Sequence, residues 1–190
     1  YDEQLEKEAA QALIAGGCVL ISQHADSMGA PTACENVGVP NVSYNGSTVA
    51  ACPNTFIISS RINWAPYFEY IINCVANGEE IAADWCGTLE TGSVQLTDLG
   101  EAVAEGTAEA LEAAEADLIA GNVHVFDITT FTVGGEALES YEADVDTDAD
   151  YTPDHEVIID GYFNESGDAF RSAPYFDVQI DGITLLDQAF

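Results

Sequence analysis

The sequence predicts an α/β fold, in which a doubly wound parallel sheet over residues 1–122 is followed by a strand-rich acidic extension over residues 123–190 packed on it. Three observations predict this fold. Segments with helical spacing of apolar residues alternate with short continuous apolar runs in residues 1–122. Polar loops follow these runs, as at residues 22–27 and 45–48. The tail instead contains short β-type runs separated by turn residues.

Four helices are expected in the first part of the chain. The first places Leu5, Ala9 and Leu13 near one face and ends before Gly16. The third carries Pro66 in its first turn, where proline is tolerated because that backbone N–H has no helical partner. In order, the expected helices span residues 2–15, 30–37, 65–75 and 107–120.

Four strands are expected between these helices. The run at 18–21 is continuously apolar, which is typical of a buried parallel strand. The others span residues 41–44, 56–59 and 93–96. In doubly wound sheets, ligands bind at the carboxyl ends of the strands. The loops at 22–27 and 45–48 are therefore the predicted site of a ligand.

The tail is expected to be built from strands. Residues 123–126 and 131–133 predict a hairpin, and residues 157–159 predict another short strand. Residues 177–186 predict a strand segment with a turn at Asp181-Gly182. Residues 142–156 form an acidic loop in which D-x-D-x-D-x-D over 144–150 resembles the start of a calcium loop. Ala149 replaces its turn glycine and His155 its final glutamate, so a solvated loop and weak cation binding both stay open.

The charge of the chain excludes several partners. Three basic residues, Lys7, Arg61 and Arg171, face 34 acidic ones, which gives a formal charge of −31. Nucleic acid is excluded as a partner and anionic membranes are disfavoured, because no basic patch can neutralise phosphates. Such acidity indicates solubility in a salty medium, with a specific cationic partner as the alternative.

The residues predict neither a metal site nor a cofactor. Five cysteines at irregular spacings contain no C-x-x-C pair, so buried free thiols are expected, or one disulfide if the protein is exported. No nucleotide loop, H-E-x-x-H or G-x-S-x-G is present. His24 and Asp26 share a loop, which leaves a hydrolase as one alternative function.

Two residues near the third strand are candidates for ligand contacts. Arg61 follows an apolar run directly, where its guanidinium could anchor ligand oxygens or form a structural salt bridge. Trp64 could stack on a flat ligand. Tyr67 and Phe68 have helical spacing and are expected in the core.

The chain resembles the basic membrane protein (BMP) family of ABC-transporter substrate-binding proteins, relatives of the purine-nucleoside receptors. Four segments carry the resemblance, which covers residues 1–120: Q-H-A-D-S at 23–27, S-Y-N-G-S at 43–47, N-W-A-P-Y at 63–67 and G-S-V-Q-L at 92–96. The chain differs from the common family pattern at Ala25, Met28, Ser43, Gly46, Ala65 and Phe68.

The resemblance implies a type I periplasmic-binding-protein-like fold with a ligand cleft between two lobes and a crossover near residues 55–80. It implies binding of a purine nucleoside, nucleobase or riboflavin-like ligand, delivery to an ABC permease, and an extracytoplasmic location as a periplasmic protein or cell-surface lipoprotein. The ligand-contact residues that it implies are Gln23, His24, Asp26, Asn45, Arg61, Asn63 and Trp64. The family's amino-terminal lobe would precede Tyr1, and its absence would favour dimers.

The leading prediction is therefore a solute-binding protein of an ABC importer and not an enzyme. A structural or adhesive cell-surface domain that uses the acidic tail is the first alternative, and the hydrolase is the second.

Overall fold

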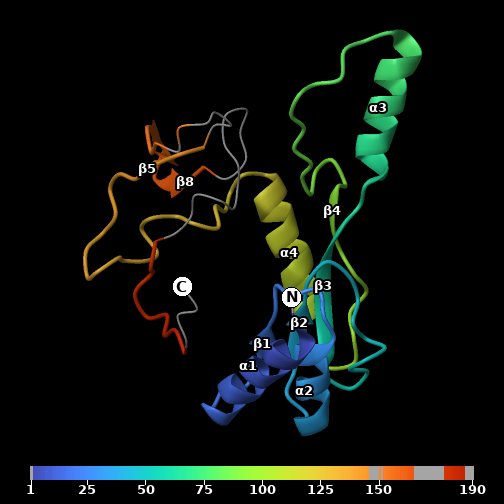
Figure 1. The fold of residues 1–190 in the computed structure, drawn as a ribbon, viewed down its shortest axis with the longest axis vertical. Helices are drawn as coiled ribbons and strands as arrows, with labels where there is room; N and C mark the ends of the chain where they lie inside the picture. The colour runs from blue at the N-terminus through green and yellow to red at the C-terminus, as the bar shows by residue number, and fades with distance from the viewer. Residues whose placement is uncertain (1, 146–149, 151, 165–177, 187–190) are drawn as a thin grey trace. The chain divides into compact units, whose positions relative to one another are not determined.

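The computed structural model describes residues 2–145, 150, 152–164 and 178–186 (Figure 1). The chain divides into two compact units, Tyr1–Ile119 and Ala120–Phe190. Each unit is described by itself. No helix among the described residues is both long enough and apolar enough to cross a membrane.

The first unit contains the four predicted helices, α1 (Glu3–Ala15), α2 (Gly29–Val37), α3 (Ala65–Asn77) and α4 (Thr107–Ile119). Asp2 caps α1, because its carboxylate accepts from the backbone N–H groups of Gln4 and Leu5 at 3.0 and 3.1 Å. Gly38 and Gly78 end α2 and α3 with φ angles of 73° and 70°, a conformation that glycine adopts without steric cost.

The sheet of this unit has four strands in the order β1-β2-β3-β4: β1 (Ile21–Ser22), β2 (Asn41–Ser43), β3 (Phe56–Ile62) and β4 (Val94–Leu96). The first three are parallel, and β4 runs antiparallel to β3. The predicted α/β class with a parallel sheet is therefore confirmed. Because β1, β2 and β3 are parallel, the loops that follow them leave the sheet at the same edge.

Small residues let α1 and α2 pack closely beside β1 and β2 (Figure 1). A Cβ on Gly29 would lie 2.3 Å from the backbone oxygen of Glu3, so α2 can begin there only with glycine. The buried cluster beneath this contact consists of Ala10, Ile21, Ala30, Ala33 and Cys34.

Two sequence expectations for this unit were wrong. Residues 18–20 are not in a strand, and Val19 is 81% exposed. Phe68, expected in the core, is 56% exposed, and with Ile72 and Val75 it forms an exposed apolar stripe on α3. Helical spacing identifies an apolar face, but it does not show what, if anything, covers that face.

The five cysteines are free. Cys34, Cys52 and Cys74 are buried, as expected for free thiols, whereas Cys18 and Cys86 are exposed.

The second unit contains two small antiparallel pairs, β5 (Glu142–Ala143) with β6 (His155–Glu156), and β7 (Ile158–Ile159) with β8 (Tyr162–Phe163). The strand predicted at 157–159 is confirmed at β7. Asp160 and Gly161 connect β7 to β8 with φ angles of 55° and 89°, as two-residue hairpin turns require. Ala143, Val145, Val157 and Phe163 form the buried core.

Two predictions for the tail were wrong. The hairpin between residues 123–126 and 131–133 does not form, because Phe126 accepts a hydrogen bond from the backbone N–H of Phe163 instead, at 3.0 Å. Residues 178–186 contain the turn at Asp181-Gly182 but no strand, and residue 177 lies outside the described residues. The Asp181 carboxylate instead accepts from Thr132 Oγ1 and from the N–H groups of Gly134 and Gly135.

Candidate functional site

The candidate site lies at the edge of the sheet where β1, β2 and β3 end. The loop after β1 carries Gln23, His24 and Asp26, and the loop after β2 carries Asn45. Arg61 lies within β3, one residue before its end, because the carboxyl half of β3 pairs with β4. The sequence prediction ended this strand too early and placed Arg61 after it.

The loop after β1 is held by contacts within itself and to α1. Gln23 Nε2 donates to the backbone oxygen of Ser27 at 3.3 Å. The Ser27 hydroxyl donates to the Glu6 carboxylate and accepts from the backbone N–H of Gly29. Gln23 Oε1 is buried and accepts no hydrogen bond from the described residues. A buried amide oxygen without a donor is costly, so Gln23 offers an acceptor to any polar group that enters the site.

Asn45 joins the loop after β2 to the loop after β1. Its Nδ2 donates to Asp26 Oδ1 at 3.3 Å. Asn45 has a φ of 63°, a left-handed conformation that asparagine tolerates better than most residues. The next N–H, on Gly46, donates to Ser59 Oγ of β3 at 3.3 Å. The loop is therefore fixed on both sides.

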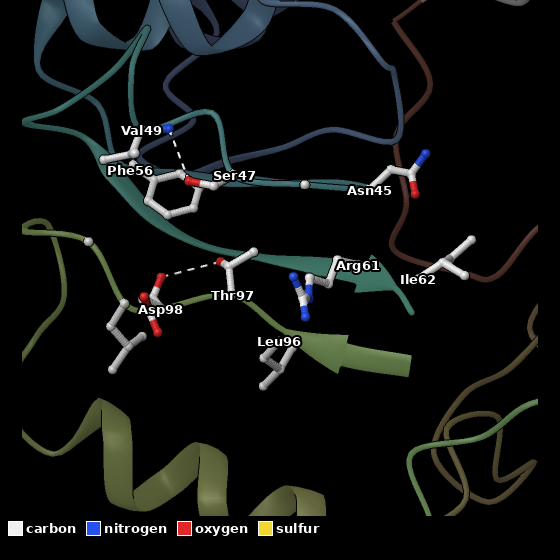
Figure 2. A pocket seen from close by; sticks show the side chains of 12 residues that line it. Asn45, Ser47, Val49, Phe56, Arg61, Ile62, Leu96, Thr97 and Asp98 are labelled. Atoms are coloured by element: carbon white, nitrogen blue, oxygen red, sulfur yellow. Dashed lines mark hydrogen bonds between the residues drawn. The ribbon is translucent and has the colours of Figure 1, made fainter. Parts of the chain in front are cut away.

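Two pockets adjoin this loop. The smaller, of about 150 Å³, is lined by side chains that include Gln23, Asp26, Tyr44 and Asn45. The larger, of about 640 Å³, lies between this loop, β3 and the segment that follows β4 (Figure 2). It is lined by Asn45, Gly46, Ser47, Val49, Phe56, Arg61, Ile62, Leu96, Thr97, Asp98, Leu99 and Gly100. Asn45, Gly46 and Ser47 line both pockets and form a shared wall.

The Arg61 side chain bonds to Gln95, which lies opposite it on β4. Arg61 Nε donates to Gln95 Oε1 at 2.9 Å, and the Nη2 nitrogen donates to the same oxygen. Among the described residues, Arg61 forms no ion pair. The salt bridge considered for Arg61 is therefore not observed within the described part of the chain.

The structure brings four of the seven predicted site residues to the pockets: Gln23, Asp26, Asn45 and Arg61. The other three line neither pocket. His24 is exposed and packs on Tyr44 with ring centroids 3.9 Å apart. Asn63 Nδ2 donates to the oxygen of Gly92, and its Oδ1 accepts from the N–H of Ala65, so this side chain fixes the start of α3. Trp64 is 57% exposed and lines neither pocket.

Sequence reasoning missed the residues that follow β4. Thr97 and Asp98 line the larger pocket, and Thr97 Oγ1 accepts from the backbone N–H of Ser59 at 3.0 Å. The pattern that could have found them is a pair of polar residues directly after the strand expected at 93–96, like the polar loops at 22–27 and 45–48 that follow the earlier strands. Nothing in the sequence shows that β4 pairs antiparallel to β3, so this polar pair could not be placed at the site from its position in the chain.

The geometry does not form the hydrolytic pair considered from the sequence. Asp26 accepts from Asn45, and no hydrogen bond joins it to His24, both residues being within the described part of the chain. Ser27, the nearest hydroxyl in the loop, is buried and bonded to Glu6.

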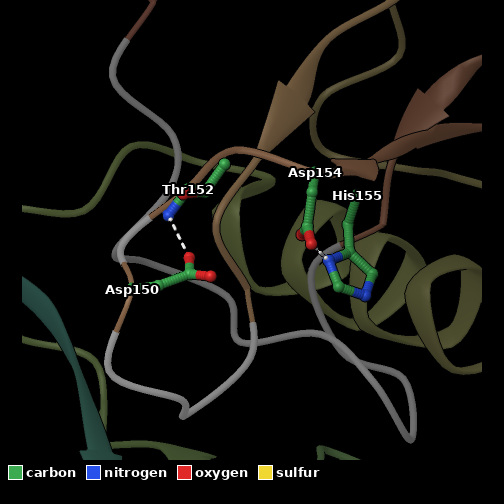
Figure 3. Close-up of polar contacts among 4 residues, drawn as sticks. All are labelled: Asp150, Thr152, Asp154 and His155. Atoms are coloured by element: carbon green, nitrogen blue, oxygen red, sulfur yellow. Dashed lines mark hydrogen bonds and ion pairs between the residues drawn. The ribbon is translucent and has the colours of Figure 1, made fainter.

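The acidic loop considered for calcium is only partly described. Asp150 accepts from the N–H of Thr152 at 2.9 Å, and Asp154 bonds to His155 Nδ1 at 2.5 Å (Figure 3). Asp146 and Asp148 lie outside the described residues. No cluster of three or more acidic, histidine or cysteine side chains that could hold a metal occurs within the described ranges.

Comparisons with known proteins show which proteins the chain is similar to. It is 27% identical over 131 residues to the putative ABC transporter glucose-binding protein TsgA13 of Haloferax volcanii, over 69% of this chain and 34% of that protein. The chain thus spans about a third of the length of this curated relative. A solved structure of an ABC transporter solute-binding protein from Conexibacter woesei is 22% identical, with a TM-score of 0.49 over 66% of this chain and 43% of that one. The chain is therefore similar to the substrate-binding proteins of ABC transporters.

A family model that matches most of the chain shows the family to which the chain belongs. The model of the PnrA-like ABC transporter substrate-binding proteins, the Bmp family, matches residues 1–129. The chain belongs to this family, as its sequence motifs predicted. The matched residues include the whole first unit and the start of the second.

Proposed function

We propose that the chain is part of an extracytoplasmic solute-binding protein of an ABC importer and binds a small, neutral, hydroxyl-rich solute where β1, β2 and β3 end. One observation carries the proposal. Asp26, Asn45 and Arg61, which lie 35 positions apart at most in the chain, come from three neighbouring strands to two pockets with a shared wall. The family match supports the transport class.

The polar groups at these pockets suit hydroxyl groups. The Asp26 carboxylate and Gln23 Oε1 accept hydrogen bonds, whereas the Arg61 guanidinium donates them. A hydroxyl both donates and accepts, so neighbouring hydroxyls can satisfy both kinds of group. Arg61 and Asp98 line the same pocket with opposite formal charges, which favours a ligand without net charge.

A sugar is the ligand class that we favour for these pockets. The relative from Haloferax volcanii is named as a glucose-binding protein. A flat base would also need an aromatic face to stack on, and Trp64 lines neither pocket. Among the aromatic side chains that do line them, Phe56 is 1% exposed and Tyr44 packs on His24.

A purine nucleoside is the second candidate. Its ribose carries hydroxyls that Asp26 and Arg61 could bind, and the matching Bmp family is described as PnrA-like. Trp64 is exposed at the start of α3, close in sequence to the end of β3. It could stack there on a base that is held between this unit and the amino-terminal lobe that the family resemblance implies. A nucleobase or a riboflavin-like ligand would depend on the same stacking.

The partner and the location that we propose for the protein are those of ABC-transporter solute-binding proteins as a class. Solute-binding proteins deliver their ligand to a membrane permease, and we extend this partner and an extracytoplasmic location, periplasmic or as a cell-surface lipoprotein, to the whole protein. We propose no catalytic role, because the His24 ring packs on Tyr44 whereas Asp26 accepts a hydrogen bond from Asn45, so the two do not form a proton-transfer pair.

A binding assay separates the candidates. Isothermal titration of the chain with D-glucose, adenosine, adenine and riboflavin should detect one class of ligand. Arg61→Met and Asp26→Asn should each weaken that binding by about tenfold or more, because each removes a charged hydrogen bond. Lys7→Met is the matched control, since it removes a positive charge from α1 and should leave binding unchanged. Binding that is insensitive to both site variants, or no binding of any probe, would contradict the proposal.

A further inference from the structure

The partner of Arg61 is unusual for so acidic a chain. Arg61 and Gln95 are directly opposite in the antiparallel register of β3 and β4, so their side chains leave the same face of the sheet. Nε and Nη2 of the guanidinium both donate to one oxygen, Gln95 Oε1, with the Nε distance at 2.9 Å. In a chain with 34 acidic residues, the group that holds this arginine is a neutral amide.

A neutral partner fixes the guanidinium without cancelling its charge. A carboxylate in the place of Gln95 would take the same donors and neutralise the charge as well. A guanidinium has five N–H donors, and two are used by Gln95, so roughly three are left for a ligand. Because the fork is planar, fixing two N–H groups also fixes the direction of the others.

The two residues differ in their access to the pocket. Arg61 lines the pocket of about 640 Å³ and is exposed, whereas Gln95 is half-buried and does not line it (Figure 2). Gln95 can therefore act on a ligand only through Arg61. We propose that Gln95 is a positioning residue that holds the Arg61 guanidinium with its free donors toward the pocket, and that this pair selects ligands with an acceptor oxygen at that place. The selection rests on the proposed function, and the positioning does not.

The positioning can be measured without a ligand. The chain has only two arginines, Arg61 and Arg171, so a ¹H–¹⁵N NMR spectrum contains two arginine Nε–Hε signals. Arg61→Lys assigns them by removing one. Gln95→Met, similar in size and lacking the acceptor, should raise the hydrogen exchange rate of the Arg61 signal by about tenfold and leave the Arg171 signal unchanged. An unchanged Arg61 exchange rate in Gln95→Met would overturn the positioning role.

The selection is tested with a double-mutant cycle, in which the probe is D-glucose or, if D-glucose does not bind, whichever of adenosine, adenine and riboflavin the wild-type chain binds. Gln95→Met should weaken binding by about three- to tenfold, and Arg61→Met by more. The double variant should bind no more weakly than Arg61→Met alone, because Gln95 acts through the arginine. Gln95→Glu should also weaken binding although it keeps the hydrogen bonds, since it neutralises the charge.

The other possible results separate the selection by the Arg61–Gln95 pair from the proposed solute-binding function. Additive losses in the double variant, or wild-type binding by Gln95→Met and Gln95→Glu, would overturn the selection while leaving the solute-binding function in place. If the wild-type chain binds none of D-glucose, adenosine, adenine and riboflavin, the proposed function and the selection fail together, and the exchange measurement alone decides the positioning.

Discussion

Asn45 Nδ2 donates a hydrogen bond to Asp26 Oδ1 at 3.3 Å and thereby joins the loops after β1 and β2. The two residues are 19 positions apart in the chain and line the same small pocket. The bond fixes the spacing between two polar groups that the sequence indicated only as separate loops.

Asn45→Ala is expected to loosen this edge of the sheet. It removes the bond to Asp26 and places alanine at a φ of 63°, so the free energy of unfolding should fall by about 1–2 kcal/mol. Asn45→Gly, which keeps the left-handed backbone accessible, should lose less. Urea unfolding of both variants measures the difference, and equal losses would show that backbone strain is not part of the effect.

Gly29→Ala is expected to push α1 and α2 apart. The new Cβ would lie 2.3 Å from the Glu3 oxygen and 3.1 Å from the Lys7 nitrogen, and these are backbone atoms that cannot move aside cheaply. The free energy of unfolding should fall by about 1–3 kcal/mol. Gly16→Ala is the control, because its nearest neighbour atom would lie at 3.3 Å and its φ of −74° suits alanine. A loss in Gly16→Ala as large as that in Gly29→Ala would contradict this account of the helix contact.

Salt is expected to stabilise the whole chain. A formal charge of −31 makes the folded state repel itself, and at about 1 M NaCl the screening length falls to about 3 Å. The urea midpoint should rise steadily with NaCl and equally with KCl, since screening does not depend on the cation. A midpoint that is flat in both salts would contradict self-repulsion, and a rise in only one would indicate specific cation binding.

Acid is expected to release the contact between α2 and the segment before β3. The Asn54 side chain, with further help from Thr55 and backbone N–H groups, lowers the pKa of Glu35 against a smaller opposing effect of burial. Because the folded pKa is depressed, this contribution is complete above the unfolded pKa of about 4.3 and is lost as the pH falls through the folded pKa. In Glu35→Gln, unfolding stability should therefore depend less on pH below about 4.3 than in the wild type. Identical pH profiles would rule the contact out as an acid-sensitive element.

The five thiols are expected to react in two groups. Cys18 and Cys86 are exposed and should react quickly with a thiol reagent in the folded protein. Cys34 should not, because burial and the neighbouring Cys52 raise its pKa to about 11, which leaves little thiolate at neutral pH. Counting thiols before and after denaturation tests this, and more than two fast thiols would show that the buried cysteines are accessible.

Much of the fold could be predicted because it depends on local signals. The four helices were found from apolar spacing and from glycines such as Gly38 and Gly78 that end them. Strand pairing is not local, and the tail shows the consequence. Phe126 bonds to Phe163 and not to the adjacent run at 131–133, and no pattern within either segment indicates that choice.

The candidate site was also predicted only in part from the sequence. The motif at residues 23–27 and the turn around Asn45 predicted two loops at the ends of strands, and both line the small pocket. Trp64 and Asn63 belong to an equally clear motif, yet neither lines either of the two pockets described above. A motif shows that residues occur together in a family, whereas the pocket depends on which backbone segments lie next to it.

The family, the α/β class, the positions of the helices and the strong negative charge could all be predicted from residue types and their spacing along the chain. The hydrogen bond between Asn45 and Asp26, the contact of Gln95 with Arg61, and the pocket that Asp98 shares with that arginine appear only in the folded structure. Each of these contacts joins separate segments, and strand order and register place them together. Register depends on the packing of the whole unit, which no single segment records.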